Sequence, residues 1–276
     1  MPLVVFGGIS TDVDAVLFDK DGTLFDAVAL WKELGRERLR LIALSGAAPG
    51  AVSLAAKAMG FEPETGVADR SGPLALATWR DEAIAVATGL YLAGFPWTRA
   101  RRIAVEAYER AEREIDISRV TALLPGVAGS LRSLANAGVV TAVVTTDSRE
   151  RSQRMLECAG IRDLVKAIVG SEDFSRSKPD PEPLLKACTI LGVSPERCAY
   201  VGDSPSDMIA AANAGMCVRA AVLTGTGDAG SLAPLSSVVL ESVAGIRPAT
   251  DTRPATGTRR TTTARPAATT RPAAGG

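Results

Sequence analysis

Residues 19–24 read Asp-Lys-Asp-Gly-Thr-Leu and follow directly on an apolar run that ends at Phe18. Two carboxylates at the end of a buried strand, beside a glycine that permits a sharp turn, can act as a nucleophile and as a general acid and base. The same letters also occur in ordinary turns and in calcium-binding loops. A helix–loop–helix calcium site needs a preceding helix and a closing glutamate, whereas a predicted strand precedes Asp19 and Leu30 stands at the closing position. Asp19 and Asp21 are therefore the first candidates for catalysis.

Three more predicted strands are followed by polar residues that suit the same chemistry. The second strand ends at Thr145 and Thr146, where a hydroxyl and the backbone N–H groups of the next helix can cradle a phosphate. Lys178 lies in a proline-rich loop, and a rigidly held ammonium can neutralise a phosphate. The last of the three runs into Gly-Asp-Ser-Pro-Ser-Asp, which places Asp203 and Asp207 at a turn into a helix. Each group alone is also typical of an ordinary strand end or helix start, so only their combination indicates a site.

Four carboxylates gathered at one edge of a sheet would repel one another unless a cation lay among them. In open parallel sheets, ligands bind beyond the carboxyl ends of the strands, where all of these residues stand. Ligation by oxygen atoms alone suits Mg²⁺. The sequence therefore predicts a magnesium site among Asp19, Asp21, Asp203 and Asp207.

The elements that position these residues are of two kinds. Apolar residues at helical spacing predict a block of helices between the first and second strands, with Asp26 and Thr98 as N-caps. From Leu123 onward, short apolar strands alternate with helices, which is typical of a parallel sheet. We expect helices over residues 27–44, 49–59, 73–92, 97–115, 127–136, 149–158, 182–191 and 206–214, and strands over 139–145, 165–169, 198–201 and 217–223.

The first strand has to join this sheet across the helical block, so the block becomes an insertion. The predicted fold class is therefore α/β, a Rossmann-like parallel sheet covered by helices on both faces, with an inserted all-helical cap domain. We expect residues 1–25 and 120–246 to form a discontinuous catalytic core and residues 26–119 the cap. Residues 247–276 are rich in Arg, Pro, Ala and Thr and hold no larger apolar side chain, so we expect a disordered tail.

Composition excludes several classes of function. The 276 residues carry 31 basic and 31 acidic side chains, but the last thirty hold six arginines and one aspartate, so the tail is +5 and the body is −5. An acidic body argues against nucleic acid as a partner and suits a protein that binds a metal cation. The basic tail leaves open a contact with an anionic partner or surface. The chain contains no histidine, which excludes Ser-His-Asp, Cys-His and histidine-metal chemistry.

The cellular compartment can also be predicted. Four cysteines, Cys158, Cys188, Cys198 and Cys217, are scattered without a Cys-x-x-Cys pair, which is typical of reduced thiols. The apolar start is too short for a secretory signal, and no apolar run approaches the ~18–20 residues of a membrane helix. We therefore expect a cytoplasmic protein without membrane contact. No pattern in the sequence indicates an oligomeric state.

Taken in order along the chain, these motifs resemble those of the haloacid dehalogenase superfamily, particularly its phosphoglycolate-phosphatase-like branch. The resemblance rests on Asp-x-Asp-Gly-Thr-Leu, the strand-ending Thr145, Lys-Pro-Asp-Pro from Lys178 and Gly-Asp-Ser-x-x-Asp from Gly202, and it covers about residues 13–25 and 120–225. It implies a Mg²⁺-dependent phosphatase that hydrolyses a small phosphomonoester, phosphoglycolate-like or a sugar phosphate, through an aspartyl-phosphate. The partner is then a small molecule.

The resemblance also implies a role for each catalytic residue. Asp19 attacks phosphorus, and Asp21 protonates the leaving oxygen and later deprotonates the hydrolytic water. Thr145 and Lys178 hold the transferring phosphoryl group, with Thr146 as the competing hydroxyl.

The implied ligands of Mg²⁺ are the Asp19 carboxylate, the Asp21 backbone carbonyl and Asp203, with Asp207 in support. The second acid also discriminates within the superfamily, because the dehalogenases and phosphonate-cleaving relatives lack it. Asp21 therefore indicates cleavage of a phosphate ester. The insertion resembles the helical cap of this branch, which closes over the site, excludes water and selects the substrate.

Three other interpretations compete with hydrolysis. A phosphomutase of the β-phosphoglucomutase type would resemble enzymes with a histidine early in the cap, whereas this chain has none and Ala27 follows Asp26 where a threonine is expected. A non-catalytic binding protein would be expected to lack an acid or the lysine, and all are present. Residues 225–230 match a dinucleotide-binding fingerprint, but no complete βαβ unit can follow them, so we interpret them as a glycine-rich turn. The specific substrate cannot be read from the sequence.

Overall fold

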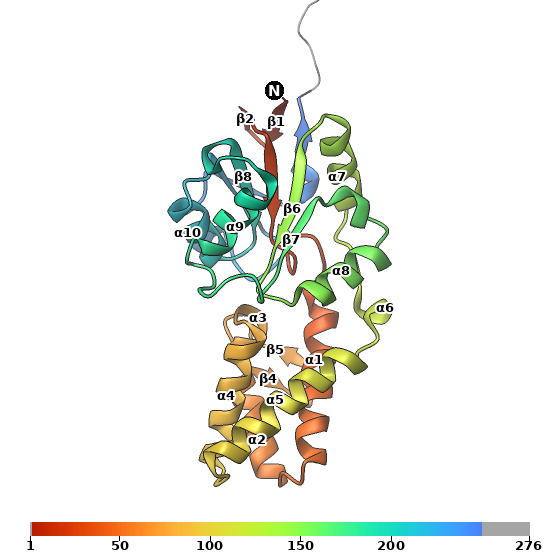
Figure 1. Ribbon diagram of the computed structural model, residues 1–276, viewed down its shortest axis with the longest axis vertical. Helices are drawn as coiled ribbons and strands as arrows, with labels where there is room; N and C mark the ends of the chain where they lie inside the picture. Colours follow the sequence, from red (N-terminus) through yellow and green to blue (C-terminus); the bar gives the residue numbers. More distant parts are fainter. Residues whose placement is uncertain (1, 250–276) are drawn as a thin grey trace, which may run out of the picture.

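The computed structural model describes residues 2–249, and along its long axis these form an α/β part and a helical part (Figure 1). The sheet of the α/β part occupies the upper half of Figure 1, and helices α1 to α5 occupy the lower half. The two parts meet where the loops that follow the strands face the short helix α3 (Figure 1).

Six parallel strands form the central sheet in the order β10-β9-β8-β3-β6-β7. They are β3 (Ala15–Phe18), β6 (Val140–Val144), β7 (Ala167–Val169), β8 (Cys198–Gly202), β9 (Val218–Val222) and β10 (Val238–Leu240). β3 lies between β6 and β8, and all four of its residues are buried because helices cover both faces of the sheet. The predicted Rossmann-like α/β fold is confirmed.

Alternate residues of β3 enter two separate hydrophobic clusters, one on each face of the sheet. Val16 and Phe18 pack in the cluster that contains residues of α7 and α8, whereas Ala15 and Leu17 pack with residues of α9 and α10. The helices of this part are α7 (Val127–Asn136), α8 (Arg149–Cys158), α9 (Glu182–Leu191), α10 (Pro205–Asn213) and α11 (Ala229–Leu232), with 3-10 turns η1 (Arg162–Leu164), η2 (Pro195–Arg197) and η3 (Val243–Gly245).

The chain between β3 and β6 forms the helical part. Its helices are α1 (Ala27–Leu44), α2 (Pro49–Met59), α3 (Pro73–Leu76), α4 (Trp79–Leu92), α5 (Trp97–Glu114) and α6 (Ile117–Val120). Asp26 caps α1 as predicted, but the third expected helix is broken at Ala77, which is extended, and Thr78 caps the start of α4. The expected cap Thr98 is wrong, because Pro96 precedes α5 as its N-cap residue.

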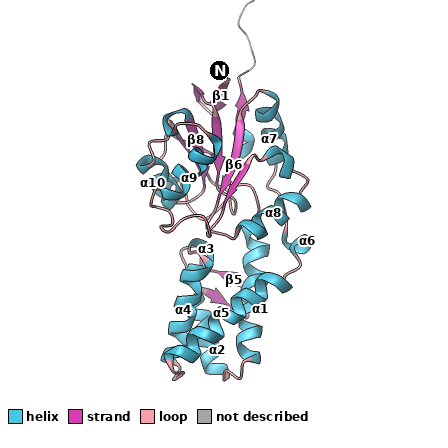
Figure 2. Ribbon diagram, viewed as in Figure 1, coloured by secondary structure: helices cyan, strands magenta, loops and turns pink. Residues whose placement is uncertain are grey.

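A short antiparallel hairpin, β4 (Phe61–Glu62) with β5 (Val67–Ala68), interrupts these helices, so the insertion is predominantly but not wholly helical (Figure 2). The ring of Phe61 packs so closely on α1 at Gly35 that a Cβ there would lie 2.7 Å from it. Two-residue strands are too short to show an alternating pattern, which is why the hairpin was not expected. The division into a core and a cap at residues 26 and 119 stays a prediction.

A second, antiparallel sheet brings together the first and last described segments in the order β11-β1-β2. Its strands are β1 (Leu3–Phe6), β2 (Ile9–Asp12) and β11 (Ile246–Pro248). The predicted disordered tail is therefore wrong at its first three residues, because Arg247 and Pro248 pair with β1 and the Ala249 N–H donates to the Leu3 carbonyl at 2.8 Å. The prediction for residues 250–276 lies outside the described residues.

Two expectations drawn from composition can be compared with the structure. All four cysteines are free. Among residues 2–249, no helix combines the length and the apolar character that crossing a bilayer requires.

Candidate active site

All seven residues singled out in the sequence line one pocket beyond the carboxyl ends of the strands. They are Asp19, Asp21, Thr145, Thr146, Lys178, Asp203 and Asp207. Ala75 and Leu76 line the same pocket from the helical part, in agreement with the place of α3 directly below the sheet in Figure 1. Groups that follow four different strands therefore meet in a space that the insertion borders.

The turn after β3 holds the two leading aspartates. The Asp19 N–H donates to the carbonyl of Val201 at 2.8 Å, which extends the pairing of β3 with β8. Gly22 then has φ +81°, and a Cβ there would lie 2.8 Å from Oδ2 of Asp203. This position requires glycine for its backbone conformation and for the close approach of a second carboxylate.

Lys178 bridges two carboxylates of this pocket. Its Nζ lies 2.7 Å from Oδ1 of Asp19 and 2.6 Å from Oδ1 of Asp207. The Tyr200 hydroxyl donates to the same Asp207 oxygen at 2.9 Å and lies 3.2 Å from the ammonium. Burial alone would lower the pKa of Lys178, but Asp19 and Asp207 raise it, so the ammonium stays charged. Tyr200 was missed in the sequence because a tyrosine inside an apolar strand resembles a core residue.

Asp207 has few lone pairs left for a further ligand. Besides Lys178 and Tyr200, it accepts hydrogen bonds from the Ser204 N–H at 3.0 Å and the Ser204 hydroxyl at 2.6 Å. The first of these and the bond from the Asp207 N–H to the Ser204 hydroxyl oxygen at 3.2 Å form the capping box of α10. Burial alone would raise the pKa of Asp207, but Lys178 lowers it. Asp207 therefore acts first as the group that holds Lys178.

Asp203 is held by residues that sequence reasoning missed. Its Oδ1 accepts from the Thr23 hydroxyl at 3.2 Å, and its Oδ2 accepts from the Thr226 N–H at 2.6 Å and the Thr226 hydroxyl at 2.9 Å. A Cβ at Gly225 would overlap this carboxylate. The glycine-rich stretch is thus a turn, as predicted, and it also borders the site. Its position directly after β9 was the available signal.

The carboxylates of Asp19, Asp203 and Asp207 lie within 4.8 Å of one another. The ammonium of Lys178 pairs with two of these three carboxylates. When all three acids are ionised, the cluster of three carboxylates and one ammonium therefore carries two uncompensated negative charges. Burial raises the pKa of Asp19 well above its usual value, against the effect of Lys178, and burial with Asp207 raises the pKa of Asp203 to about 6. These buried oxygen donors and this charge fit a hard divalent cation.

The two candidate threonines differ in their surroundings. The Thr145 hydroxyl accepts from the Asp147 N–H at 3.1 Å, and the residue is 2% exposed. That bond leaves the Thr145 proton available for donation. Thr146 is only half-buried, and it borders both this pocket and the adjoining one.

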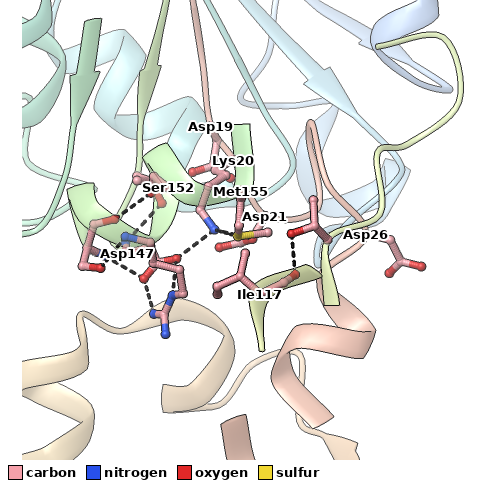
Figure 3. Close-up of polar contacts among 12 residues, drawn as sticks. Asp19, Lys20, Asp21, Asp26, Ile117, Asp147, Ser152 and Met155 are labelled. Carbon is pink, nitrogen blue, oxygen red and sulfur yellow. Dashed lines mark hydrogen bonds and ion pairs between the residues drawn. The ribbon is translucent and has the colours of Figure 1, made fainter. Parts of the chain in front are cut away.

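Lys20, between the two leading aspartates, is completely buried. Its Nζ lies 2.8 Å from Oδ1 of Asp21, 2.8 Å from Oδ2 of Asp147 and 3.2 Å from the sulfur of Met155 (Figure 3). Burial alone would lower the pKa of Lys20, but Asp147 and Asp21 raise it. Lys20 therefore holds the Asp21 carboxylate in position. The sequence did not reveal this role because Asp147 follows a different strand.

Arg151 extends this charged cluster to the helical part. Its Nε donates to Oδ2 of Asp147 at 2.8 Å, and its Nη1 donates to Oε2 of Glu112 on α5 at 2.6 Å. The Ser148 hydroxyl donates to Oε1 of the same glutamate at 2.9 Å. Glu112 therefore docks α5 against the start of α8, and the chain of contacts continues through Asp147 and Lys20 to Asp21.

Comparison with known proteins agrees with this geometry. A family model described as haloacid dehalogenase-like hydrolase matches residues 13–215. A phosphoglycolate phosphatase from Chromobacterium violaceum is 31% identical over 229 residues, which are 80% of this chain and 89% of that protein. The pyrophosphatase PpaX from Halalkalibacterium halodurans is 37% identical over 91 residues, 33% of this chain and 42% of that protein.

Among solved structures, CbbY from Rhodobacter sphaeroides in complex with phosphate superposes with a TM-score of 0.62 at 23% identity, covering 84% of this chain and 95% of that chain. At that identity the likeness shows the fold alone. The family match spans most of the chain. It includes all seven of the pocket residues that were singled out in the sequence. The chain therefore belongs to the haloacid dehalogenase-like hydrolases, in their phosphoglycolate-phosphatase-like branch, and is a phosphatase-type hydrolase.

Proposed function

We propose that this protein hydrolyses a small phosphomonoester through an aspartyl-phosphate intermediate and uses Mg²⁺. The observation that carries the proposal is the meeting of Asp19, Asp21 and Lys178 with a cluster of carboxylates in one pocket bordered by the insertion. Relatives named as a phosphoglycolate phosphatase and a pyrophosphatase support a substrate with a transferable phosphoryl group. Both a phosphoglycolate-like ester and a sugar phosphate are candidate substrates at this level.

In the first half of the reaction, a carboxylate oxygen of Asp19 forms a bond to phosphorus while the bond from phosphorus to the leaving oxygen breaks. The carboxylic acid of Asp21 gives its proton to that leaving oxygen. Lys178 and the Thr145 hydroxyl hold the non-bridging oxygens of the phosphoryl group and stabilise the charge that develops on them.

In the second half, a water oxygen attacks the phosphorus of the aspartyl-phosphate. The Asp21 carboxylate takes a proton from that water, the bond between phosphorus and the Asp19 oxygen breaks, and inorganic phosphate leaves. Both aspartates return to their starting protonation states, so atoms and charge balance over the cycle.

The metal would be held by carboxylate oxygens of Asp19 and Asp203 and by the backbone carbonyl of Asp21, with Asp207 in support. When bound, Mg²⁺ supplies positive charge that offsets the phosphoryl oxygens and the clustered carboxylates. Lys178 remains the protein's own cation at the same place.

The proposal is tested by the Asp19→Asn variant with p-nitrophenyl phosphate as substrate. An amide cannot replace the carboxylate nucleophile, so we expect kcat to fall by at least about 10³-fold. A chelator should abolish turnover by the unaltered protein, and added Mg²⁺ should restore it. The matched control is Asp26→Asn, because asparagine also caps a helix well.

Circular dichroism and thermal unfolding confirm that both variants are folded. Substantial turnover by folded Asp19→Asn would overturn the nucleophile. An isomeric phosphate ester as the product of a sugar phosphate, without release of inorganic phosphate, would favour a phosphomutase instead.

A further inference from the structure

We infer that the leaving group of the substrate is an uncharged alcohol with an apolar face, an inference that rests on the proposed phosphatase function. A second pocket adjoins the phosphoryl pocket and shares Asp21, Thr146 and Ala75 with it. Asp21 is the group that would protonate the leaving oxygen, and the second pocket is the space beside Asp21 into which the rest of the leaving group can extend. The residues that line this pocket therefore select the substrate.

One wall of the second pocket is apolar. It is formed by Leu30, Trp31 and Leu34 of α1, Leu74 of α3 and Trp79 of α4. Trp31 is 7% exposed and Leu74 6% exposed, so the wall is packed in place before any ligand arrives. Such a wall favours the C–H face of a polyol or ring over a strongly hydrated ion.

The polar end of the wall is an ion pair that is already complete. Nη1 of Arg38 lies 2.8 and 2.7 Å from the two carboxylate oxygens of Glu82, and the Tyr108 hydroxyl donates to Oε1 of Glu82 at 2.7 Å. The guanidinium also stacks over the Tyr108 ring, with its carbon 4.0 Å from the ring centroid. Arg38 and Glu82 are 3% and 2% exposed, so the positive charge of Arg38 is neutralised within the protein.

The charged side chains that the α/β part contributes to the second pocket also neutralise one another. Arg151 pairs with Asp147 and with Glu112, and the buried Lys20 behind them pairs with Asp147 and Asp21. Among the described residues, the cations that line the pocket are Arg38 and Arg151, and each already has a carboxylate partner.

A carboxylate or phosphate on the leaving group would enter this space without a cation of its own. It would also lie among the carboxylates of Glu82 and Asp147, and burying an unpaired charge is costly. Two exposed arginines of the insertion, Arg70 and Arg80, donate to the core carbonyls of Gly225 and Ser171 and do not line the pocket. A neutral hydroxyl meets no such penalty.

One donor of the Arg38–Glu82 pair has no partner among the described residues. Nε of Arg38 is buried and has no hydrogen-bond partner in the described structure, although both carboxylate oxygens of Glu82 are engaged. This atom is inaccessible from the pocket, so it offers no contact to a ligand. Arg38 is thus held by Glu82 and presents no unpaired charge to an anion.

The test measures kcat/KM for pairs of phosphomonoesters in which a neutral hydroxymethyl group of the leaving group is replaced by a carboxylate. The pairs are 2-hydroxyethyl phosphate against 2-phosphoglycolate and glycerol 3-phosphate against 3-phosphoglycerate, within a panel that includes hexose phosphates and pyrophosphate. We expect the neutral member of each pair to be preferred by about tenfold or more, and the best substrate of the panel to have a neutral leaving group. A best substrate with an anionic leaving group would overturn the inference.

The experiment gives different results if this inference is wrong and if the proposed function is wrong. If p-nitrophenyl phosphate and the whole panel are inert with Mg²⁺, the phosphatase proposal fails, and this inference fails with it. If the carboxylate-bearing members are hydrolysed as well as the neutral members or better, the phosphatase stands and only the neutral leaving group is wrong.

The Glu82→Gln variant tests the ion pair itself. Glutamine keeps the size and an acceptor for Tyr108 but leaves the charge of Arg38 unpaired. We expect the preference within each pair to shift toward the carboxylate member by about tenfold. Glu106→Gln on α5 is the control, since Glu106 is exposed and pairs only loosely with Arg102 at 3.9 Å, and it should leave the preference unchanged. An unshifted preference in folded Glu82→Gln would overturn the role of the pair, and the ranking by the unaltered protein decides the inference even if this variant does not fold.

Discussion

The edge of the six-stranded sheet and the wall of the helical insertion face one another across the same cleft, yet they carry charge in opposite ways. At the edge, the ammonium of Lys178 pairs with Asp19 and Asp207, while Asp203 lies beside them without a cation partner in the described chain, so negative charge is left for a ligand to neutralise. In the wall, Arg38 and Glu82 neutralise each other and leave nothing for an ion. The phosphoryl end of a substrate and its metal fit the first region, and an uncharged remainder fits the second.

The two regions also differ in how the chain builds them. Each group at the edge lies in the segment that connects a strand to the next helix or in the first turn of that helix, so local sequence and the parallel sheet together determine its place. The wall combines side chains of α1, α3 and α4, and its ion pair depends on Tyr108 of α5. The residues proposed to carry out the reaction are thus placed by individual loops of the α/β part. The residues proposed to select the leaving group are placed by the packing of several helices of the insertion.

The largest effect should come from Asp21→Ala, which removes a group that belongs to both regions. We expect kcat to fall by about 10² to 10⁴-fold, because both protonation of the leaving group and activation of water are lost. Alkyl phosphates should suffer more than p-nitrophenyl phosphate in single-turnover formation of the phospho-enzyme, since the aryl oxygen leaves without a proton. Equal losses for the two classes of ester would contradict the acid role.

Lys178→Met tests the charge balance at the edge. Loss of the ammonium removes one stabilising charge from the phosphoryl group, so kcat should fall by about 10² to 10³-fold. The Mg²⁺ concentration for half-maximal activity should not rise, because the pocket becomes more negative. Lys186→Met, on an exposed position of α9, is the control. Similar losses in both lysine variants would contradict a special role for Lys178.

The smallest effect should come from Glu112→Gln. This change weakens the contact of α5 with the start of α8, and Glu112 itself lines neither the phosphoryl pocket nor the adjoining one. A neutral amide keeps the size but loses the ion pair with Arg151, so we expect KM to rise by a few-fold at nearly unchanged kcat. Glu114→Gln is matched to it, because Glu114 lies on the same helix and pairs with Arg40 and Arg110 inside the insertion. A fall in kcat larger than the rise in KM would show that Glu112 does more than dock α5.

Asp19, Thr145 and Asp203 could be predicted because each directly follows an apolar strand, and Lys178 because it lies in a proline-rich loop between a strand and a helix, so the rule for parallel sheets placed all four at one edge. Their partners were harder to find. Thr226 and Gly225 lie in a stretch that matches a different motif, and Lys20 looks like a solvent-exposed charge until Asp147 is placed beside it. Such partners are determined by tertiary contact alone.

The ion pair of the wall could not be predicted. Arg38 and Glu82 lie on different helices, and nothing in the local pattern of either helix indicates a buried charge. The break at Ala77 was also missed, although it is what separates α3, which borders the phosphoryl pocket, from α4. The strands β1, β2 and β11 were missed because three or four residues give too short an alternation to recognise.

The pairing of β1 with β11 has a consequence for the kinetics of folding. Val4 lies opposite Pro248, so this contact closes a loop that contains nearly the whole described chain, and the Ser130 hydroxyl of α7 donates to the Ile246 carbonyl at 2.8 Å beside it. Contacts between residues so distant in sequence carry a large loop-closure entropy until the intervening chain is compact, which places them late in folding. Substitutions that weaken the pairing of β1 with β11 are therefore expected to raise the rate of unfolding more than they lower the rate of folding.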